Sequence, residues 1–323
     1  MAVLNQNQNQ NQDQSIAVGV ERRFRTRYNS DIESRLANVA APDTLVADVI
    51  PGAAHNYPVF HKYWDADWHA CEHLNDFLQH IIAVATAVPT TWIAQYDTAA
   101  GNGAVNIPPR DMNRAQLGAQ VLQILQLGLE REARFAEIID QDDGPGAINY
   151  WLGMLKIDPA RHPATYLMVH VGRRIGEHVA MCLKGHFMCP RPSEVSTWIT
   201  PMIDPPVTPS YPAGHAIQSY LMSYLLAFTF TNDATGASML PQHQLPAIGG
   251  TANAFLANGR GALFDLATRV SQNRVVAGIH YPVDIRAGQA VAHRIFQDIR
   301  NVNSIWVDLR NAVRGEFPQY VRP

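Results

Sequence analysis

The sequence has no long apolar run. Its longest one, Leu221–Phe230, covers ten residues and includes Ser223 and Thr229, whereas a membrane-spanning helix needs about 20. The N-terminal MAVLNQNQNQNQDQS is polar where a signal peptide has its apolar centre. We therefore expect no transmembrane segment and a cytoplasmic protein. Export would still be possible if a signal peptide had been removed from the sequence.

Cysteine and positive charge are also scarce. The three cysteines, Cys71, Cys182 and Cys189, form neither an even set nor a CxxC pair, so we expect reduced thiols rather than disulfides. The formal net charge is −3 and no basic block is present, which argues against nucleic acid as a partner. Strand signals are sparse and no repeat period stands out.

The apolar residues that are present, 47% of the chain, are enough for a sizeable core. Their helical spacing predicts an all-α bundle, with helices over 76–88, 114–140, 163–183, 215–230, 255–276 and 283–300. We expect residues 1–15, which are rich in Asn and Gln, to be a disordered tail. Residues 16–323 would then form a single helical domain, and the helices over 114–140 and 163–183 could supply the face of a homodimer.

Three short motifs within residues 184–284 gather cations, histidines and a carboxylate. They are Lys184 with Arg191 and Pro192 in LKGHFMCPRP, Gly214 with His215 in PSYPAGHA, and Arg274 with His280 and Asp284 in NRVVAGIHYPVD. The motif-bearing core of the domain is therefore expected to lie at about residues 163–300.

The residue types in these motifs suit a tetrahedral oxyanion. Arg191 and Arg274 offer planar forks of donors, and Lys184 is a compact charge. Gly214 precedes an apolar run, so a helix that begins there would direct its free N–H groups toward an anion. His215 is placed to exchange protons. Asp284 follows His280 by four residues, so its carboxylate can bind one ring nitrogen and leave the other for the site.

Together, Lys-x6-Arg-Pro, Pro-x-Gly-His and Arg-x5-His-x3-Asp resemble the signature of the type 2 phosphatidic acid phosphatase superfamily. That superfamily also holds bacterial acid phosphatases and vanadium-dependent haloperoxidases. The resemblance covers about a third of the chain and implies the helical bundle of the vanadium haloperoxidase and acid phosphatase type. The separation of His215 from Arg274 is long for the family, which suggests an insertion around residues 231–261.

The resemblance implies two chemistries for one pocket. In a haloperoxidase, vanadate would be the cofactor and His280 its ligand, while His215 would accept a proton from hydrogen peroxide and Lys184 would polarise the peroxide for attack by a halide. In a soluble acid phosphatase, His280 would attack a phosphate monoester to give a phosphohistidine and His215 would protonate the leaving group. Lys184, Arg191, Gly214 and Arg274 would bind the oxyanion in both.

We favour the haloperoxidase, because the Pro-rich segment between the first two motifs resembles the soluble bacterial haloperoxidase-like group. Ala213 stands where the family usually has Ser, which removes a hydrogen bond worth about 1–3 kcal/mol, and Asn273 replaces another Ser. Met181 and Thr208 occupy the positions where chloroperoxidases have Trp and Phe, so bromide or iodide is expected rather than chloride. A non-catalytic oxyanion-binding protein is a third hypothesis, which Ala213 alone supports.

Two other patterns have simpler interpretations. His69, Glu72 and His73 match a zinc-protease spacing, but the match is short and the chain has 13 histidines, so we expect a structural or surface role. Trp64 and Trp68 share a helical face and are expected to belong to the core. We expect His186, which lies inside the first motif, to face away from the site.

Overall fold

The structure is a computed structural model, and it describes residues 65–84, 91–100, 108–142, 146–230 and 262–317. The chain divides into residues 1–64 and residues 65–323, and all described residues belong to the second unit. The expected tail over 1–15, the position of Trp64 and the insertion around 231–261 lie outside the described residues. Within those residues every regular element is a helix, which confirms the all-α prediction.

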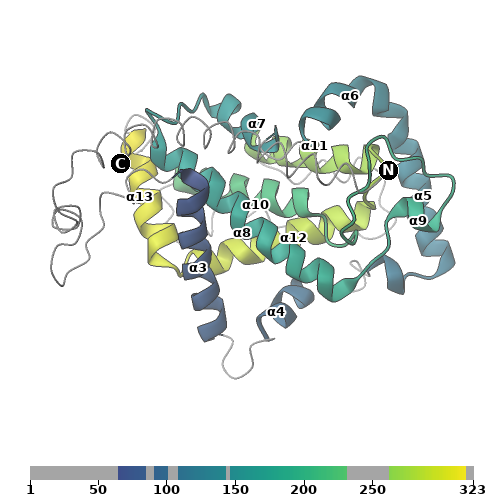
Figure 1. Cartoon of the computed structure of the whole chain (residues 1–323), viewed down its shortest axis with the longest axis horizontal. Coiled ribbons are helices and arrows are strands. Elements are labelled where there is room, and N and C mark those ends of the chain that lie inside the picture. Colours follow the sequence, from purple (N-terminus) through teal and green to yellow (C-terminus); the bar gives the residue numbers. More distant parts are fainter. Residues whose placement is uncertain (1–64, 85–90, 101–107, 143–145, 231–261, 318–323) are drawn as a thin grey trace, which may run out of the picture. The chain divides into compact units, whose positions relative to one another are not determined.

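The described helices follow one another along the chain as in Figure 1. They are α3 (Ala66–Val84), α4 (Thr91–Ala100), α5 (Arg114–Leu127), α6 (Arg131–Asp140), α7 (Gly146–Leu155), α8 (Pro163–Phe187), α9 (Pro192–Val195), α10 (Gly214–Thr229), α11 (Ala262–Val276), α12 (Pro282–Ile299) and α13 (Leu309–Glu316). Single turns of other helix types are η2 (Pro109–Asp111), η3 (Gly128–Glu130) and the π-helical η5 (Ser304–Asp308).

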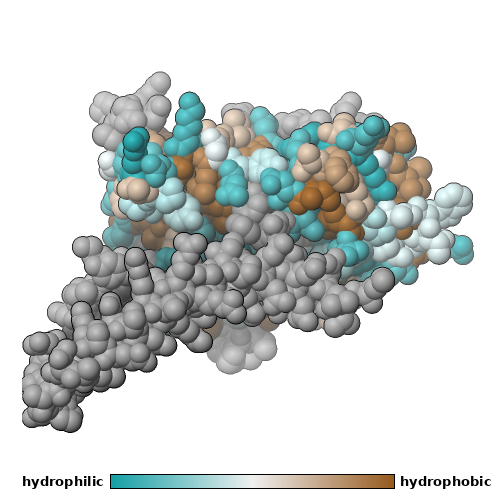
Figure 2. Space-filling view, turned by 45° about the horizontal axis from the view of Figure 1, so that its top comes forward, coloured by the Kyte–Doolittle hydropathy of each residue, from teal (hydrophilic) through white to brown (hydrophobic). Residues whose placement is uncertain are grey.

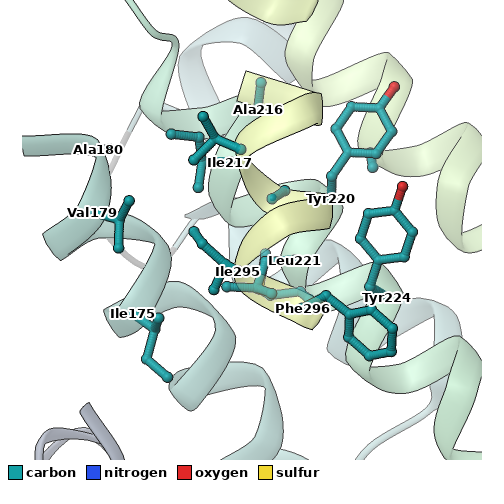
Figure 3. Close-up of a cluster of buried hydrophobic side chains, with 14 of the residues drawn as sticks. Ile175, Val179, Ala180, Ala216, Ile217, Tyr220, Leu221, Tyr224, Ile295 and Phe296 are labelled. Atoms are coloured by element: carbon teal, nitrogen blue, oxygen red, sulfur yellow. The ribbon is translucent and has the colours of Figure 1, made fainter. Parts of the chain in front are cut away.

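Helix α10 is the centre of the core and packs against α8, α11 and α12. Its side chains are apolar on almost every face, as is typical of a helix enclosed by others. Figure 3 shows Ile217 and Leu221 of α10 near Val179 of α8 and Ile295 of α12, and all four side chains are fully buried.

Glycines allow the closest contacts of α10. A Cβ atom added at Gly176 of α8 would lie 3.1 Å from the Cα of Gln218. A Cβ atom added at Gly288 of α12 would lie 2.7 Å from the Cβ of Ala216 and 2.8 Å from the carbonyl oxygen of Ala213. The first turn of α10, which carries the second motif, is therefore fixed against α12 with no room for a methyl group.

The helix boundaries around the motifs agree with the sequence to within a few residues. Helix α8 starts at Pro163, whose fixed φ suits a first turn, and continues past Lys184 to Phe187. Asp284 lies in the first turn of α12, as expected. The expected single helix over 114–140 was wrong, because a 3-10 turn at Gly128–Glu130 separates α5 from α6. Glycine is a poor helix former and permits such a break.

The expected burial of Trp68 was also wrong. The side chain of Trp68 is 65% exposed, so it is not a core residue. Arg134, which belongs to the charged run 130–134, is buried and donates to the Asn273 side chain. None of the described helices has both the length and the apolar character needed to cross a membrane. The face seen in Figure 2 mixes hydrophilic and hydrophobic residues over the described part of the chain.

Candidate functional site

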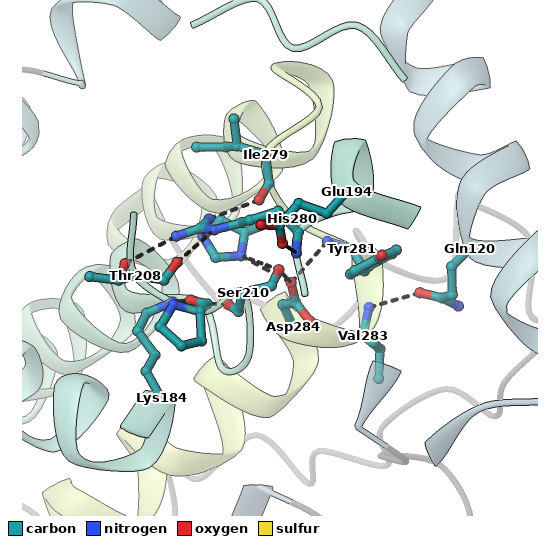
Figure 4. A network of polar contacts seen from close by, with 12 residues as sticks. Gln120, Lys184, Glu194, Thr208, Ser210, Ile279, His280, Tyr281, Val283 and Asp284 are labelled. Carbon is teal, nitrogen blue, oxygen red and sulfur yellow. Dashed lines mark hydrogen bonds and ion pairs between the residues drawn. The ribbon is translucent and has the colours of Figure 1, made fainter. Parts of the chain in front are cut away.

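The start of α12 positions a buried carboxylate against a histidine (Figure 4). Asp284 is fully buried, and its Oδ2 accepts hydrogen bonds from the Ser210 hydroxyl at 2.5 Å and the Tyr281 N–H at 3.0 Å. Nδ1 of His280 lies 3.0 Å from the same oxygen. Burial raises the pKa of Asp284 to about 6. The carboxylate therefore anchors one nitrogen of the imidazole, as the spacing of four residues predicted.

The other nitrogen of His280 faces Arg191. Nη1 of Arg191 lies 3.0 Å from Nε2 of His280 and also donates to the Ile279 carbonyl at 2.8 Å, while its Nε donates to the Thr208 carbonyl at 2.9 Å. A guanidinium can only donate, so Nε2 must accept and the proton of His280 must be on Nδ1. Burial, followed by the charges of Arg191 and Lys184, holds the pKa of His280 well below its usual value.

Lys184 lies in the last turn of α8 and is held by two backbone carbonyls. Its Nζ donates to the oxygen of Pro209 at 2.5 Å and of Ser210 at 3.0 Å, and the side chain is only 4% exposed. Burial, together with the positive charge of Arg191, lowers the pKa of this amine to about 7. Two of the three ammonium protons are thus engaged, and the third can bind a ligand.

His215 and Arg274 are both bound to the end of α6. Nε2 of His215 lies 3.1 Å from the Gln141 carbonyl oxygen, to which it donates as the Nε2–H tautomer. Arg274 is fully buried and donates to the Ile138 carbonyl at 2.9 Å and the Asp142 carboxylate at 3.2 Å. Residues distant in sequence therefore fix an imidazole and a guanidinium at the same end of α6.

The charges of the three motifs act on one another. Burial, followed by Arg274 and then by Lys184 and Arg191, lowers the pKa of His215 to about 3. The same three cations lower the pKa of His280. Nε of Arg274 is buried and has no hydrogen-bond partner among the described residues. Such a donor costs free energy until an acceptor reaches it, and an oxyanion supplies acceptors only.

The first turn of α10 adds backbone donors to this cluster. The helix begins at Gly214, so its first N–H groups have no partner within the helix. A Cβ atom at this position would lie 3.9 Å from Cε of Lys184, so the lysine stem passes beside the start of the helix. Ala213 supplies no hydroxyl, and its N–H donates to the carbonyl of Asp284 at 3.1 Å. The structure therefore brings all the residues of the three motifs into one electropositive region.

Two contributors to this region were not found from the sequence. Ser210 lies just before the second motif, and its hydroxyl binds Asp284. Gln141, at the end of α6, accepts from His215 through its carbonyl and from Asn273 through its side-chain oxygen at 2.9 Å. The position of Ser210 beside a motif was an available signal, but nothing in the sequence near Gln141 indicates that it contacts residues 74 and 132 positions away.

The remaining candidate residues lie elsewhere. Nδ1 of His69 lies 3.2 Å from Glu72 on α3, and the part of the chain that the structure describes contains no group of three or more His, Cys, Asp or Glu residues suited to a metal ion. His186 lies 3.1 Å from the Asp97 carboxylate and is 44% exposed. The three cysteines are free.

Comparison of the chain with models of known protein families found no match, and the curated proteins include none that matches it closely enough to be a relative.

Proposed function

We propose that this chain binds a tetrahedral oxyanion in the region between His215, His280, Lys184, Arg191 and Arg274, and that it is a vanadium-dependent haloperoxidase. The observation that carries this proposal is the hydrogen-bonded chain from Asp284 through His280 to Arg191. It provides a neutral imidazole whose Nε2 lone pair faces a group of buried cations. Such a lone pair can bind the central atom of an oxyanion whose oxygens the cations neutralise.

The residues present fit vanadate. Nε2 of His280 would be the ligand to vanadium, and the Arg191 N–H group that now donates to Nε2 would donate to an oxyanion oxygen instead. The unpartnered Nε of Arg274, the third ammonium proton of Lys184 and the first N–H groups of α10 supply further donors. When bound, vanadate supplies a Lewis acid that activates hydrogen peroxide for the oxidation of a halide.

The resting state of His215 suits the acceptance of a proton from peroxide, whereas ester hydrolysis has to start from a protonated imidazole. With a pKa of about 3 and its Nε2 proton donated to Gln141, the imidazole is neutral near pH 7 and its Nδ1 is unprotonated. A neutral imidazole can accept a proton from hydrogen peroxide. Protonation of a leaving alkoxide would instead have to start from the imidazolium. Arg274 and Lys184 destabilise the imidazolium in either reaction, so a bound anion must offset their charge.

Bromide or iodide is the proposed halide. Thr208 stands where chloroperoxidases have Phe, and its hydroxyl accepts from Nη2 of Arg191 at 3.2 Å, so it offers a polar group rather than an aromatic ring. Met181, at the Trp position, is 48% exposed and does not line a buried halide pocket. Bromide and iodide are easier to oxidise than chloride and need less help from such a pocket.

The alternative is a soluble acid phosphatase. The same Nε2 lone pair of His280, once released from its hydrogen bond with Arg191, could attack a phosphate monoester, with transfer of the phosphoryl group to nitrogen and departure of the alcohol. The cations would stabilise the transferring group as they would stabilise vanadate. This reaction would require the dianionic substrate to raise the pKa of His215 enough for that imidazole to carry a proton.

Paired assays decide between these functions. The purified protein is loaded with orthovanadate and assayed for bromide and iodide oxidation by hydrogen peroxide, and the vanadate-free protein is assayed for hydrolysis of p-nitrophenyl phosphate. Oxidation that depends on vanadate supports the proposal, whereas phosphate release inhibited by vanadate supports the phosphatase. Binding of the oxyanion without either activity would support the third hypothesis, a non-catalytic oxyanion-binding protein. His280→Ala should abolish activity, and His186→Ala, which changes an exposed histidine nearby in sequence, should not.

A further inference from the structure

Ser210 is held rigidly between the first and third motifs. Its side chain is fully buried, its N–H donates to the Cys189 carbonyl at 2.9 Å, and its carbonyl accepts from Nζ of Lys184 at 3.0 Å. Both backbone groups are therefore fixed by the segment that carries the first motif. The hydroxyl is left as the only group of this residue that can act on the third motif.

That hydroxyl reaches the anchored pair of the third motif (Figure 4). Oγ of Ser210 donates to Oδ2 of Asp284 at 2.5 Å and lies 3.5 Å from Nδ1 of His280. Oδ1 of Asp284 is buried and has no partner among the described residues. The carboxylate is thus oriented through Oδ2 alone, by Ser210, His280 and the Tyr281 N–H.

We propose that Ser210 is a positioning residue of the candidate site, whose hydroxyl fixes Asp284 so that the His280 proton stays on Nδ1 and the lone pair on Nε2. The expected effect of Ser210 on catalysis rests on the proposed function, because both reactions considered above need that lone pair. The expected effect of Ser210 on the tautomer of His280 does not depend on the proposed function.

Two other buried serines, Ser219 and Ser271, do not bind a side chain of the motifs as Ser210 does. Ser219 of α10 is 1% exposed, and its Oγ has no partner among the described residues. Ser271 of α11 donates to the Ala267 carbonyl of its own helix. Without the Ser210 donor, Oδ2 keeps only two donors and the carboxylate can rotate away from Nδ1. The proton can then occupy Nε2 and compete with the Arg191 hydrogen bond.

The test measures the tautomer directly. Protein labelled with 15N at histidine is studied without vanadate by long-range 1H–15N NMR, and the His280 signals are assigned by their loss in His280→Gln. Wild-type protein is expected to show the Nδ1–H pattern. Ser210→Ala is expected to show a mixture with the Nε2–H form, and Ser219→Ala should match the wild type. If Ser210→Ala does not fold, Ser210→Cys, which has a weaker donor, should show the same mixture.

Activity gives a second readout of this proposal. Partners that orient a metal-ligating histidine typically contribute about 10–100-fold to affinity or activity, so Ser210→Ala should lower kcat by at least about tenfold with little change in KM for peroxide. A wild-type tautomer pattern in the variant that folds, or equal losses in Ser219→Ala, would overturn the role of Ser210. Wild-type protein that is inactive in both assays would instead overturn the proposed function, while the tautomer spectrum would still decide the role of Ser210.

Discussion

Nη1 of Arg191 and Nε2 of His280 lie 3.0 Å apart, and this contact, together with the burial of the ring, keeps the imidazole neutral. A protonated His280 would bring two positive groups together in a buried place, at a large cost in free energy. The neutral ring avoids that cost and keeps one lone pair facing the cations. The fork of Arg191 is fixed in turn by the carbonyls of Thr208 and Ile279.

The three contacts of the Arg191 guanidinium predict that Arg191→Lys weakens the binding of the oxyanion. An ammonium cannot bind Thr208, Ile279 and His280 at once, so the affinity for vanadate or phosphate should fall by more than about tenfold, as expected when a charge-assisted hydrogen bond is lost. Isothermal titration calorimetry measures this affinity. Arg161→Lys, a change at an exposed arginine before α8, should bind as the wild type does. Unchanged affinity in Arg191→Lys would show that the Arg191 side chain does not bind the anion.

The charge of Lys184 predicts a pH-dependent affinity for anions. Because burial lowers the pKa of its amine to about 7, the cation is present below pH 7 and is lost as the pH rises through that value. Affinity for sulfate, whose charge is constant in this range, should fall by about tenfold between pH 6 and pH 8. Lys184→Met should bind sulfate weakly at both values. Calorimetry that finds the same pH dependence in the variant would assign it to another group.

Gly288→Ala should destabilise the fold around the second motif. Its Cβ would lie 2.7 Å from the Cβ of Ala216 and 2.8 Å from the oxygen of Ala213, and overpacking of this kind costs about 1–3 kcal/mol. Urea denaturation measures the loss. Gly118→Ala, on an exposed position of α5 with open space around it, should instead raise stability by about 0.5–1 kcal/mol. Equal stabilities of Gly288→Ala and wild type would show that α12 can move.

Glu137 should stabilise the fold in a pH-dependent manner. Hydrogen bonds from Arg269 and Asn273 lower the pKa of its carboxyl to about 2. Because the folded pKa lies below the ordinary value of 4.5, the contribution is complete above pH 4.5 and is lost as the pH falls toward 2. Glu137→Gln should therefore lower stability at pH 7 and change it little near pH 2.

The effect of Glu137→Gln should be below about 1 kcal/mol, since the ion pair is partly exposed and screened by solvent. Urea denaturation at several pH values gives the difference between variant and wild type. Glu132→Gln, at an exposed position of the same helix, is the matched control. A difference that does not change with pH would assign the stabilisation to packing.

Local signals in the sequence predicted much of the secondary structure near the motifs. Pro163 marks the start of α8, and the Gly214 step followed by apolar residues marks the start of α10. The four-residue spacing of His280 and Asp284 predicted their contact. These features depend on neighbours in sequence, so they can be read without knowledge of the packing.

Features that depend on distant parts of the chain were not predictable in the same way. The sequence contains Gly128, but one glycine does not decide whether a helix breaks or continues. The contacts of Gln141 with His215 and Asn273 join α6 to α10 and α11. The exposure of Trp68 likewise depends on which helices cover α3, and its apolar character alone suggested the core.

The binding of His215 and Arg274 at residues 138–142 also means that these two side chains cap a helix. Backbone N–H groups of residues 141 and 142 satisfy the carbonyls of Glu137 and Ile139 at the end of α6. A guanidinium and an imidazole N–H satisfy those of Ile138 and Gln141. A one-residue deletion in α6 would rotate these carbonyls by about 100° around the helix axis and release both side chains together. The length of α6, a helix without any motif residue, is therefore as constrained as the motifs themselves.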